Sequence, residues 1–358
     1  MPAGSERGQS AFSSMPRLRV IRNTGAVWIG MLFLAACAGI VSPENPDPVY
    51  DDLSGRFIID GSSTVYPISQ AMAEEFGYLT SDVQIPVGVS GSGGGFTKFC
   101  AGETAITDAS RPIKPIEAEL CEANHIEFIE IPVALDGLSV LINPANDWVE
   151  CMTVEQLETM WEPTAEGVIT NWNQIDPSFP DQPLLLYGPG TDSGTYDYFT
   201  EVIVGEEGAS RGDYTGSEDD NILIQGVAGN NSALGFFGYA YYEENQDRLK
   251  LVAVDGGDGC VEPTAETIAN GEYQPLSRPI FIYINAEDAA RPEVASFVNF
   301  YLEEADDIIP DVGYIPFMDN FYDAMIERFH DGRTGSVFLV TDVTAVSGTE
   351  GLLFPEEK

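Results

Sequence analysis

One local pattern recurs three times along the chain and restricts the folds that it can adopt. A short apolar run is followed by a turn of small and hydroxyl residues, and then by apolar residues at helical spacing. The three turns are GSSTVYP at 61–67, SGSGGG at 90–95 and GTDSGT at 190–195. A strand, a turn and a helix in succession are typical of units with parallel strands. The sequence therefore predicts an α/β fold.

Other segments extend this pattern on both sides of the turns. Strands are expected at 56–61, 83–90 and 278–285, with two more within 125–143, and helices are expected to begin near 63–67 and 96 and to cover 293–305. The glycine run at 90–95 is expected to be a loop that leads into its helix.

The composition of the three turns favours an anion as ligand. The first turn of a helix has unpaired N–H donors and the positive end of the helix dipole, so it binds anions without a cationic side chain. One Ser or Thr before a helix is most often only an N-cap. Three such turns, each after an expected strand, favour a shared anion site.

The motifs of several enzyme classes are absent from the sequence. It has no G-x-x-x-x-G-K-[ST] P-loop and no G-x-S-x-G in the context of a nucleophile elbow. It has only two histidines, His125 and His330, and neither is near the three turns. No CxxC occurs and the histidines form no cluster with the cysteines, so neither a metal site nor a cofactor is expected.

The charge of the chain excludes two classes of partner. Its 358 residues include 58 Asp and Glu but only 16 Lys and Arg, which gives a formal net charge of −42. A surface this acidic repels nucleic acid and anionic lipid headgroups.

The N-terminus predicts export. Three arginines at 17, 19 and 22 precede an apolar run at 26–37 that is too short to span a bilayer and ends in Leu-Ala-Ala-Cys, similar to a bacterial lipobox. We expect residues 1–36 to be a signal peptide, Cys37 to be lipidated and 37–54 to be a tether. The alternative is an ordinary cleaved signal with an incidental Cys. Removal of residues 1–36, which hold four Arg and one Glu, leaves a net charge of −45.

Export also changes what the remaining cysteines predict. Cys100, Cys121, Cys151 and Cys260 are an even number outside the cytoplasm, which favours two disulfides. Three pairings are open.

Three segments resemble one protein family. They are GSSTVYPISQAMAEEF, VSGSGGGFTKFCAGETAITDASRPI and GPGTDSGTYDYF. In this order they resemble the phosphate-binding protein of bacterial phosphate ABC transporters, in its lipoprotein and cyanobacterial-type branch, from about Phe57 to Pro316. The resemblance implies a type II periplasmic-binding-protein fold, in which two α/β lobes joined by two crossings close on one phosphate. Lobe 1 would be 55–138 plus 284–358 and lobe 2 would be 139–283, with crossings near 134–143 and 278–285.

The two lobes favour one disulfide pairing. Cys100–Cys121 and Cys151–Cys260 would each stay within a single lobe, whereas a bridge between the lobes would hinder closure.

The resemblance also implies a set of ligand residues. Phosphate would be bound by Ser63, Thr64, Val65, Ser92, Ser193, Gly194 and Thr195. The sequence departs from the family in two places, because Pro189 stands where well-known members have an Arg, and Ser110 stands where they have an Asp that accepts the phosphate proton.

Because of these two departures, other residues must supply the guanidinium and the acceptor of the phosphate proton. Arg111 is the candidate guanidinium, because its planar fork suits phosphate oxygens; the alternative is a salt bridge to one of the many carboxylates. Asp108 and Asp192 are the candidate proton acceptors, and Asp192 can equally cap its own helix.

The function that follows from the resemblance is capture without chemistry. We expect an exported, lipid-anchored, monomeric solute-binding protein of the periplasm or cell surface that is not an enzyme and delivers inorganic phosphate to a membrane ABC permease. The alternatives are the same fold binding sulfate, arsenate or molybdate, an extracellular phosphatase or other hydrolase, and a phosphate sensor.

Overall fold

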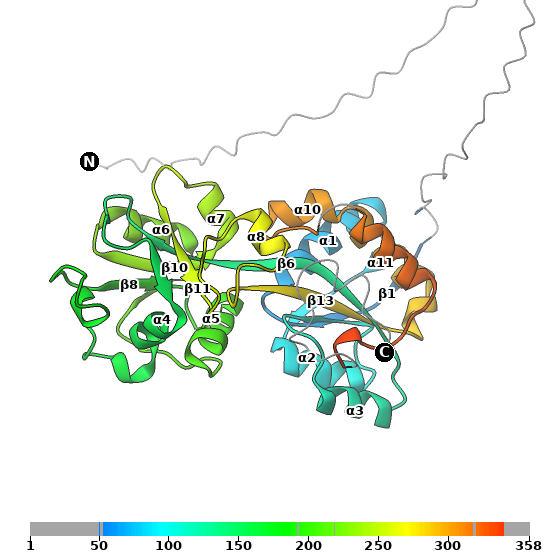
Figure 1. Cartoon of the computed structure of the whole chain (residues 1–358). Helices are drawn as coiled ribbons and strands as arrows, with labels where there is room; N and C mark the ends of the chain where they lie inside the picture. Colours follow the sequence, from blue (N-terminus) through cyan, green and yellow to red (C-terminus); the bar gives the residue numbers. More distant parts are fainter. Residues whose placement is uncertain (1–49, 51–52, 192, 218, 318–319, 340–358) are drawn as a thin grey trace, which may run out of the picture. The chain divides into compact units, whose positions relative to one another are not determined.

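The computed structural model describes residues 50, 53–191, 193–217, 219–317 and 320–339. Within them the chain is a mixed α/β protein of two lobes (Figure 1). The strands are β1 Gly55–Arg56, β2 Ile59–Gly61, β3 Val83–Gln84, β4 Val87–Val89, β5 Ile106–Ala109, β6 Phe128–Ile142, β7 Cys151–Thr153, β8 Leu185–Gly188, β9 Thr215–Gly216, β10 Ala233–Gly238, β11 Lys250–Asp255, β12 Cys260–Val261 and β13 Ser277–Asn285.

The helices alternate with these strands along most of the chain. They are α1 Tyr66–Leu79, α2 Gly91–Cys100, α3 Pro115–Ala123, α4 Val154–Trp161, α5 Gly194–Phe199, α6 Asp220–Gly229, α7 Tyr239–Glu243, α8 Ala265–Ala269, α9 Pro292–Glu303, α10 Ala305–Asp311 and α11 Phe321–His330. Shorter turns are η1 Pro163–Ala165, η2 Trp172–Gln174, η4 Asp288–Ala290 and η5 Val337–Leu339, and η3 Thr200–Val204 continues α5 as a π-helix.

The main sheet explains why the hydroxyl-rich turns gather at one place. Its strands follow the order β4-β2-β5-β13-β6-β10-β8-β9, and β11 pairs with β6, β7 and β12. β2 is parallel to both β4 and β5, and β10 is parallel to β8. The carboxyl ends of parallel strands meet at one edge of a sheet, which is where ligands of α/β proteins bind. The turns after β2, β4 and β8 start at such ends.

β6 is one strand, so the expectation of two strands within 125–143 is wrong. All of its residues from Phe128 to Ile142 are buried. It pairs with β13 up to Gly137 and with β10 from Leu138 onward, so it belongs to the sheets of both lobes (Figure 1). The Asp-Gly pair in its middle makes no turn, because both residues pair with β13 and the next residue, Leu138, already pairs with β10.

The strand expected at 83–90 also differs from the prediction. The segment expected as one strand at 83–90 is divided into β3 and β4 around Pro86, whose missing N–H cannot pair in a sheet. At the second crossing, residues 281–284 of β13 pair with β5. The predicted limits of the two lobes stay a prediction.

The glycine run is a helix and not a loop. α2 begins at Gly91, and its first turns are the glycines themselves. A Cβ on Gly95 would lie only 2.7 Å from the Cα of Gly61, so only glycine lets α2 pack this closely on the end of β2. This packing outweighs the low helix propensity of glycine.

Apolar side chains at helical spacing bury the first helix. Ile68, Met72 and Phe76 of α1 are fully buried, and Phe76 packs against Phe297 of α9 with ring centroids 5.5 Å apart. Each helix in the described ranges is too short or too polar to cross a membrane.

The structure confirms both predicted disulfides. Cys100 in α2 is bonded to Cys121 in α3, and Cys151 in β7 is bonded to Cys260 in β12. Each bridge ties together elements that already contact each other.

Candidate functional site

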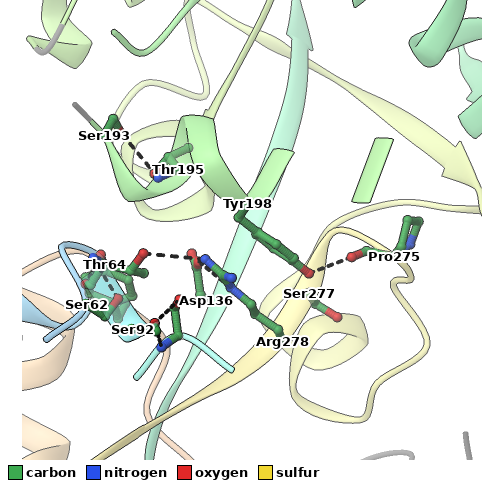
Figure 2. A network of polar contacts seen from close by, with 12 residues as sticks. Ser62, Thr64, Ser92, Asp136, Ser193, Thr195, Tyr198, Pro275, Ser277 and Arg278 are labelled. Atoms are coloured by element: carbon green, nitrogen blue, oxygen red, sulfur yellow. Dashed lines mark hydrogen bonds and ion pairs between the residues drawn. The ribbon is translucent and has the colours of Figure 1, made fainter. Parts of the chain in front are cut away.

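A cavity of about 230 Å³ lies where the turn after β2 faces the turn after β8. Its lining includes Ser63, Thr64, Asp136, Ser193, Gly194, Thr195, Ser217 and Tyr314. Figure 2 shows how Thr64 and Asp136 lie opposite Ser193 and Thr195. The structure thus brings together five of the residues that were predicted to bind phosphate, from two of the three turns.

The turn after β2 is held from both sides. The backbone N–H of Thr64 donates to Oγ of Ser62 at 3.2 Å, and the Tyr314 hydroxyl donates to the carbonyl of Thr64 at 2.6 Å. Val65 precedes α1, and its side chain is fully buried in the core. A turn fixed in this way presents its hydroxyl groups without the entropy cost of ordering a loop.

The turn after β8 is a capped helix start. Oγ of Ser193 accepts the backbone N–H of Thr195 at 3.2 Å and so caps α5. Gly194 faces the turn after β2, and a Cβ on it would lie 2.8 Å from the backbone nitrogen of Thr64. The two turns therefore approach each other through a residue that has no side chain.

A buried arginine–carboxylate pair lies beside these turns. Arg278 and Asp136 are opposite each other in the β13–β6 pairing, and Nε and Nη2 of Arg278 are each 3.3 Å from Oδ2 of Asp136. Nη2 is also 3.5 Å from Oγ1 of Thr64. Arg278 is not itself in the lining, and it borders the cavity through Thr64 and Asp136.

Burial changes the proton affinity of two groups at the cavity. Loss of water raises the pKa of the Asp136 carboxyl, and the charge of Arg278 offsets part of that rise. Burial also raises the pKa of the Tyr241 hydroxyl to about 12, with Asp220 adding to the shift. Both Asp136 and Asp220 line the cavity. A site with two carboxylates favours a ligand that can donate a proton.

Ser92 of the third turn and Arg111, the predicted guanidinium, are not among the residues that line this cavity. Oγ of Ser92 accepts the backbone N–H of Ser110 at 3.1 Å, and the two hydroxyl oxygens are 3.0 Å apart. The guanidinium of Arg111 forms two hydrogen bonds to the Glu117 carboxylate, at 2.9 and 2.8 Å, and lies over the ring of Phe96. Arg111 is thus in the salt bridge that was the alternative to its role as a ligand.

Three further positions named in the sequence analysis are Asp108, Asp192 and Pro189. Asp108 is fully buried, and its Oδ1 accepts the Ser69 hydroxyl at 2.8 Å. Asp192 lies outside the described residues. Pro189 lines the cavity at the position where the family was expected to have an Arg.

Sequence reasoning missed Arg278, Asp136 and Tyr314. One sign was available for Asp136, because it is a carboxylate within a long apolar stretch that becomes one buried strand. Arg278 starts a strand that was predicted, but only the pairing of β6 with β13 brings it to Asp136 and Thr64.

Comparison with known proteins covers most of the chain. Residues 45–305 match a family model described as a PBP superfamily domain. The chain is 51% identical over 286 residues to protein SphX of Synechocystis sp., an alignment that covers 80% of this chain and 85% of that protein. It is 36% identical over 304 residues to the phosphate-binding protein PstS of Staphylococcus saprophyticus, covering 84% and 91%.

A solved structure has the same architecture. The crystal structure of a possible phosphate binding protein from Planctomyces limnophilus is similar with a TM-score of 0.74 and 47% identity. The match covers 78% of this chain and 99% of that one.

Proposed function

The chain belongs to the PBP superfamily and, within it, to the family of PstS and SphX; on this premise we propose that it binds inorganic phosphate between its lobes. A membrane ABC importer then receives the phosphate. The observation that carries the proposal is the meeting of Ser63 and Thr64 with Ser193 and Thr195 around one cavity. Hydroxyl groups from two opposed turns can surround a small tetrahedral anion.

Arg278 is the guanidinium that we assign to the phosphate. It lies within reach of Thr64, and only 12% of its side chain is exposed, so its charge acts in a medium with little water. A charge-assisted hydrogen bond there is worth roughly 1.5–3 kcal/mol. This assignment replaces Arg111. Arg111 makes two hydrogen bonds of 2.9 and 2.8 Å to Glu117, whereas the contacts of Arg278 with Asp136 are longer, at 3.3 Å, and Arg278 also contacts Thr64 of the cavity lining.

Asp136 is the acceptor that we assign to the phosphate proton. At neutral pH phosphate carries an O–H that can donate to a carboxylate, whereas sulfate has none. Arg278 contacts Oδ2 of Asp136, and sulfate would bring an oxygen without a proton against the other oxygen of this buried carboxylate, at a cost on the order of 1–3 kcal/mol or more. The site should therefore prefer phosphate and arsenate over sulfate and molybdate.

Calorimetry of the ligand-stripped protein tests the function and both assignments. We expect phosphate to bind with submillimolar affinity and sulfate to bind much more weakly. Arg278→Ala should weaken phosphate binding on the order of 100-fold, and Arg278→Lys should recover only part of the loss, because a point charge cannot fork onto two oxygens. Arg333→Ala is the control, since that side chain is exposed and pairs only with Asp331 among described residues.

Three outcomes of this experiment would each contradict one statement. No heat with phosphate in the wild type contradicts the function. A 100-fold loss in Arg111→Ala with none in Arg278→Ala returns the guanidinium to Arg111. Asp136→Asn that binds sulfate no better than the wild type contradicts the role of Asp136 in selectivity.

Hydrolysis is the competing function of a different class. The chain is a member of a family of solute-binding proteins, and we propose that it has no catalytic activity. Incubation with a chromogenic phosphate ester checks this. Turnover that persists after purification and is lost in Thr64→Ala would support a hydrolase.

Export and anchoring complete the proposal. Cys37 lies outside the described residues, and we propose that it is lipidated after removal of residues 1–36, so that the monomeric protein stays on the outer surface of a membrane. Cys37→Ser should move the protein from the membrane fraction to the soluble fraction. A mutant that stays with the membrane, together with an unmodified Cys37 in the wild type by mass spectrometry, contradicts the anchor.

A further inference from the structure

One face of the Arg278 guanidinium is covered by an aromatic ring. The guanidinium carbon lies 3.6 Å from the centroid of the Tyr198 ring, and Tyr198 is 3% exposed. Tyr198 is in α5, which starts at the Ser193 turn, whereas Arg278 is at the start of β13. Figure 2 shows the two side chains stacked beside the cavity residues. The stack therefore joins the turn that lines the cavity to the crossing between the lobes.

The other contacts of the guanidinium are long. Its distances to Asp136 are 3.3 Å and its distance to Thr64 is 3.5 Å, so each of these hydrogen bonds is weak. A guanidinium held only by them could turn about its own side-chain bonds. The flat ring of Tyr198 limits the guanidinium to a single plane and leaves the N–H edge available.

The same tyrosine also holds the backbone next to Arg278. The Tyr198 hydroxyl donates to the carbonyl of Pro275 at 2.5 Å. Ser277 is held in addition by a bond from its hydroxyl to the carbonyl of Tyr273, also at 2.5 Å. The segment that carries Arg278 is thus fixed in its backbone as well as in its side chain.

We propose that Tyr198 is a positioning residue for phosphate binding: its ring holds the Arg278 guanidinium in the plane that presents its N–H groups to the ligand. The proposal rests on the proposed function and on the assignment of Arg278. Neither Tyr198 nor Arg278 is among the residues that line the cavity. Arg278 contacts Thr64 and Asp136 of the lining, whereas Tyr198 contacts Arg278, so Tyr198 acts through Arg278. A cation–π contact is worth about 0.5–2 kcal/mol, which corresponds to roughly 2- to 30-fold in affinity.

Two substitutions separate the ring from the hydroxyl. Tyr198→Phe keeps the ring and should bind phosphate within about threefold of the wild type. Tyr198→Met fills most of the volume but has no π face, and it should bind roughly 5- to 30-fold more weakly. Tyr196→Met is the matched control, because Tyr196 is also a buried tyrosine of α5 but stacks on Tyr214. Its effect on affinity should be below threefold.

A double-mutant cycle distinguishes positioning from a general loss of structure. In the background with Arg278 intact, Tyr198→Met should weaken phosphate binding strongly. In the Arg278→Ala background it should weaken binding by less than twofold, because the guanidinium that Tyr198 positions is gone. Equal weakening in both backgrounds means a structural role and overturns the proposal. Melting temperatures of all variants identify any that is unfolded, and Tyr198→Leu then replaces Tyr198→Met.

Chemical modification gives a readout that does not need phosphate. Phenylglyoxal reacts with accessible arginines, and peptide mass mapping of the ligand-free protein gives the rate at Arg278. We expect the rate to rise at least fivefold in Tyr198→Met and to stay unchanged in Tyr198→Phe and Tyr196→Met. An Arg278 rate that is the same in Tyr198→Met and in the wild type overturns the stacking role, even if the wild type binds no phosphate and the proposed function itself has failed.

Discussion

Gly194 faces Thr64 so closely that any side chain on Gly194 would collide with Oγ1 of Thr64. A Cβ at this position would also lie 3.0 Å from Oγ of Ser63. The two residues come from opposite turns of the cavity, after β8 and after β2. The approach of the turns is therefore limited by a single hydrogen atom on Gly194.

Gly194→Ala should keep the two turns apart. The methyl group meets the backbone nitrogen of Thr64 at 2.8 Å, and backbone cannot move aside as a flexible side chain can. We expect phosphate affinity to fall at least tenfold while the melting temperature changes little, since Ala is a good residue for the first turn of a helix. Calorimetry measures the affinity, and small-angle scattering with saturating phosphate should show a more open molecule.

Gly229→Ala is the control for this substitution. Gly229 ends α6, and a Cβ there meets no atom within 4 Å. Its affinity should equal that of the wild type. A Gly194→Ala protein that binds phosphate as tightly as Gly229→Ala would show that close approach of the turns is not required.

The buried carboxyl of Asp108 should make stability depend on pH. Burial raises the pKa of Asp108 to about 7, although the Ser69 hydroxyl opposes the shift. Because the folded state holds this proton more tightly than the unfolded state, the stability contributed by Asp108 is complete below about pH 4. It is lost by roughly 1.4 kcal/mol per pH unit up to about pH 7.

Asp108→Asn tests this dependence, because an amide does not titrate. The free energy of unfolding of the variant relative to the wild type should increase from pH 4.5 to 7 and stay level above it. Urea denaturation at several pH values measures the difference. A difference that is constant over this range would mean that the Asp108 carboxyl has its ordinary pKa.

Loss of the Cys151–Cys260 bridge should lower stability without changing binding. The bridge spans 109 residues of sequence, and closing a loop of that length stabilises the folded state by about 5 kcal/mol in the chain-entropy model. Both cysteines lie in strands next to β11, away from the cavity lining. The double variant Cys151→Ala/Cys260→Ala should unfold at lower denaturant concentration and bind phosphate within threefold of the wild type. A large loss of affinity would contradict this separation.

Salt should not weaken phosphate binding, although the ligand is an anion. The chain has a formal net charge of −42, so phosphate is repelled at long range. Sodium chloride screens that repulsion over about 8–10 Å and has little effect on buried contacts. We expect affinity that is constant or higher between 50 and 500 mM salt. A steep decrease, as for a ligand bound by exposed lysines, would contradict a buried site.

The strand–turn–helix units, which consist of residues close together in the sequence, could be predicted from sequence. Strand, turn and helix follow one another as expected after β2 and β8, because each of these units is set by neighbouring residues. The glycine run was assigned to a loop because glycine is a poor helix former. Its helical structure depends on the contact of Gly95 with Gly61, which joins residues 34 positions apart. Sequence patterns contain no information on such a contact.

Sequence reasoning identified only part of the site, because the other part depends on contacts between residues far apart in the sequence. Thr64 and Ser193 each belong to a turn that sequence identifies. The guanidinium was assigned to Arg111 because it follows the glycine run, whereas Arg278 reaches Thr64 only through the pairing of β13 with β6. Register between strands that are 142 residues apart, as at Asp136 and Arg278, is a property of the folded chain.

The pairing of β6 with β13 has a mechanical consequence for release of the ligand. Nine residue pairs join the strands, from Phe128 opposite Asn285 to Gly137 opposite Ser277, with a bulge between Ile280 and Phe281. Such a ribbon can twist with its hydrogen bonds intact, whereas sliding one strand along the other would break them all at once. Twisting is therefore the motion of the lobes that keeps these hydrogen bonds. For the proposed capture of phosphate, the contacts broken on opening are then those around the ligand and not those of the ribbon.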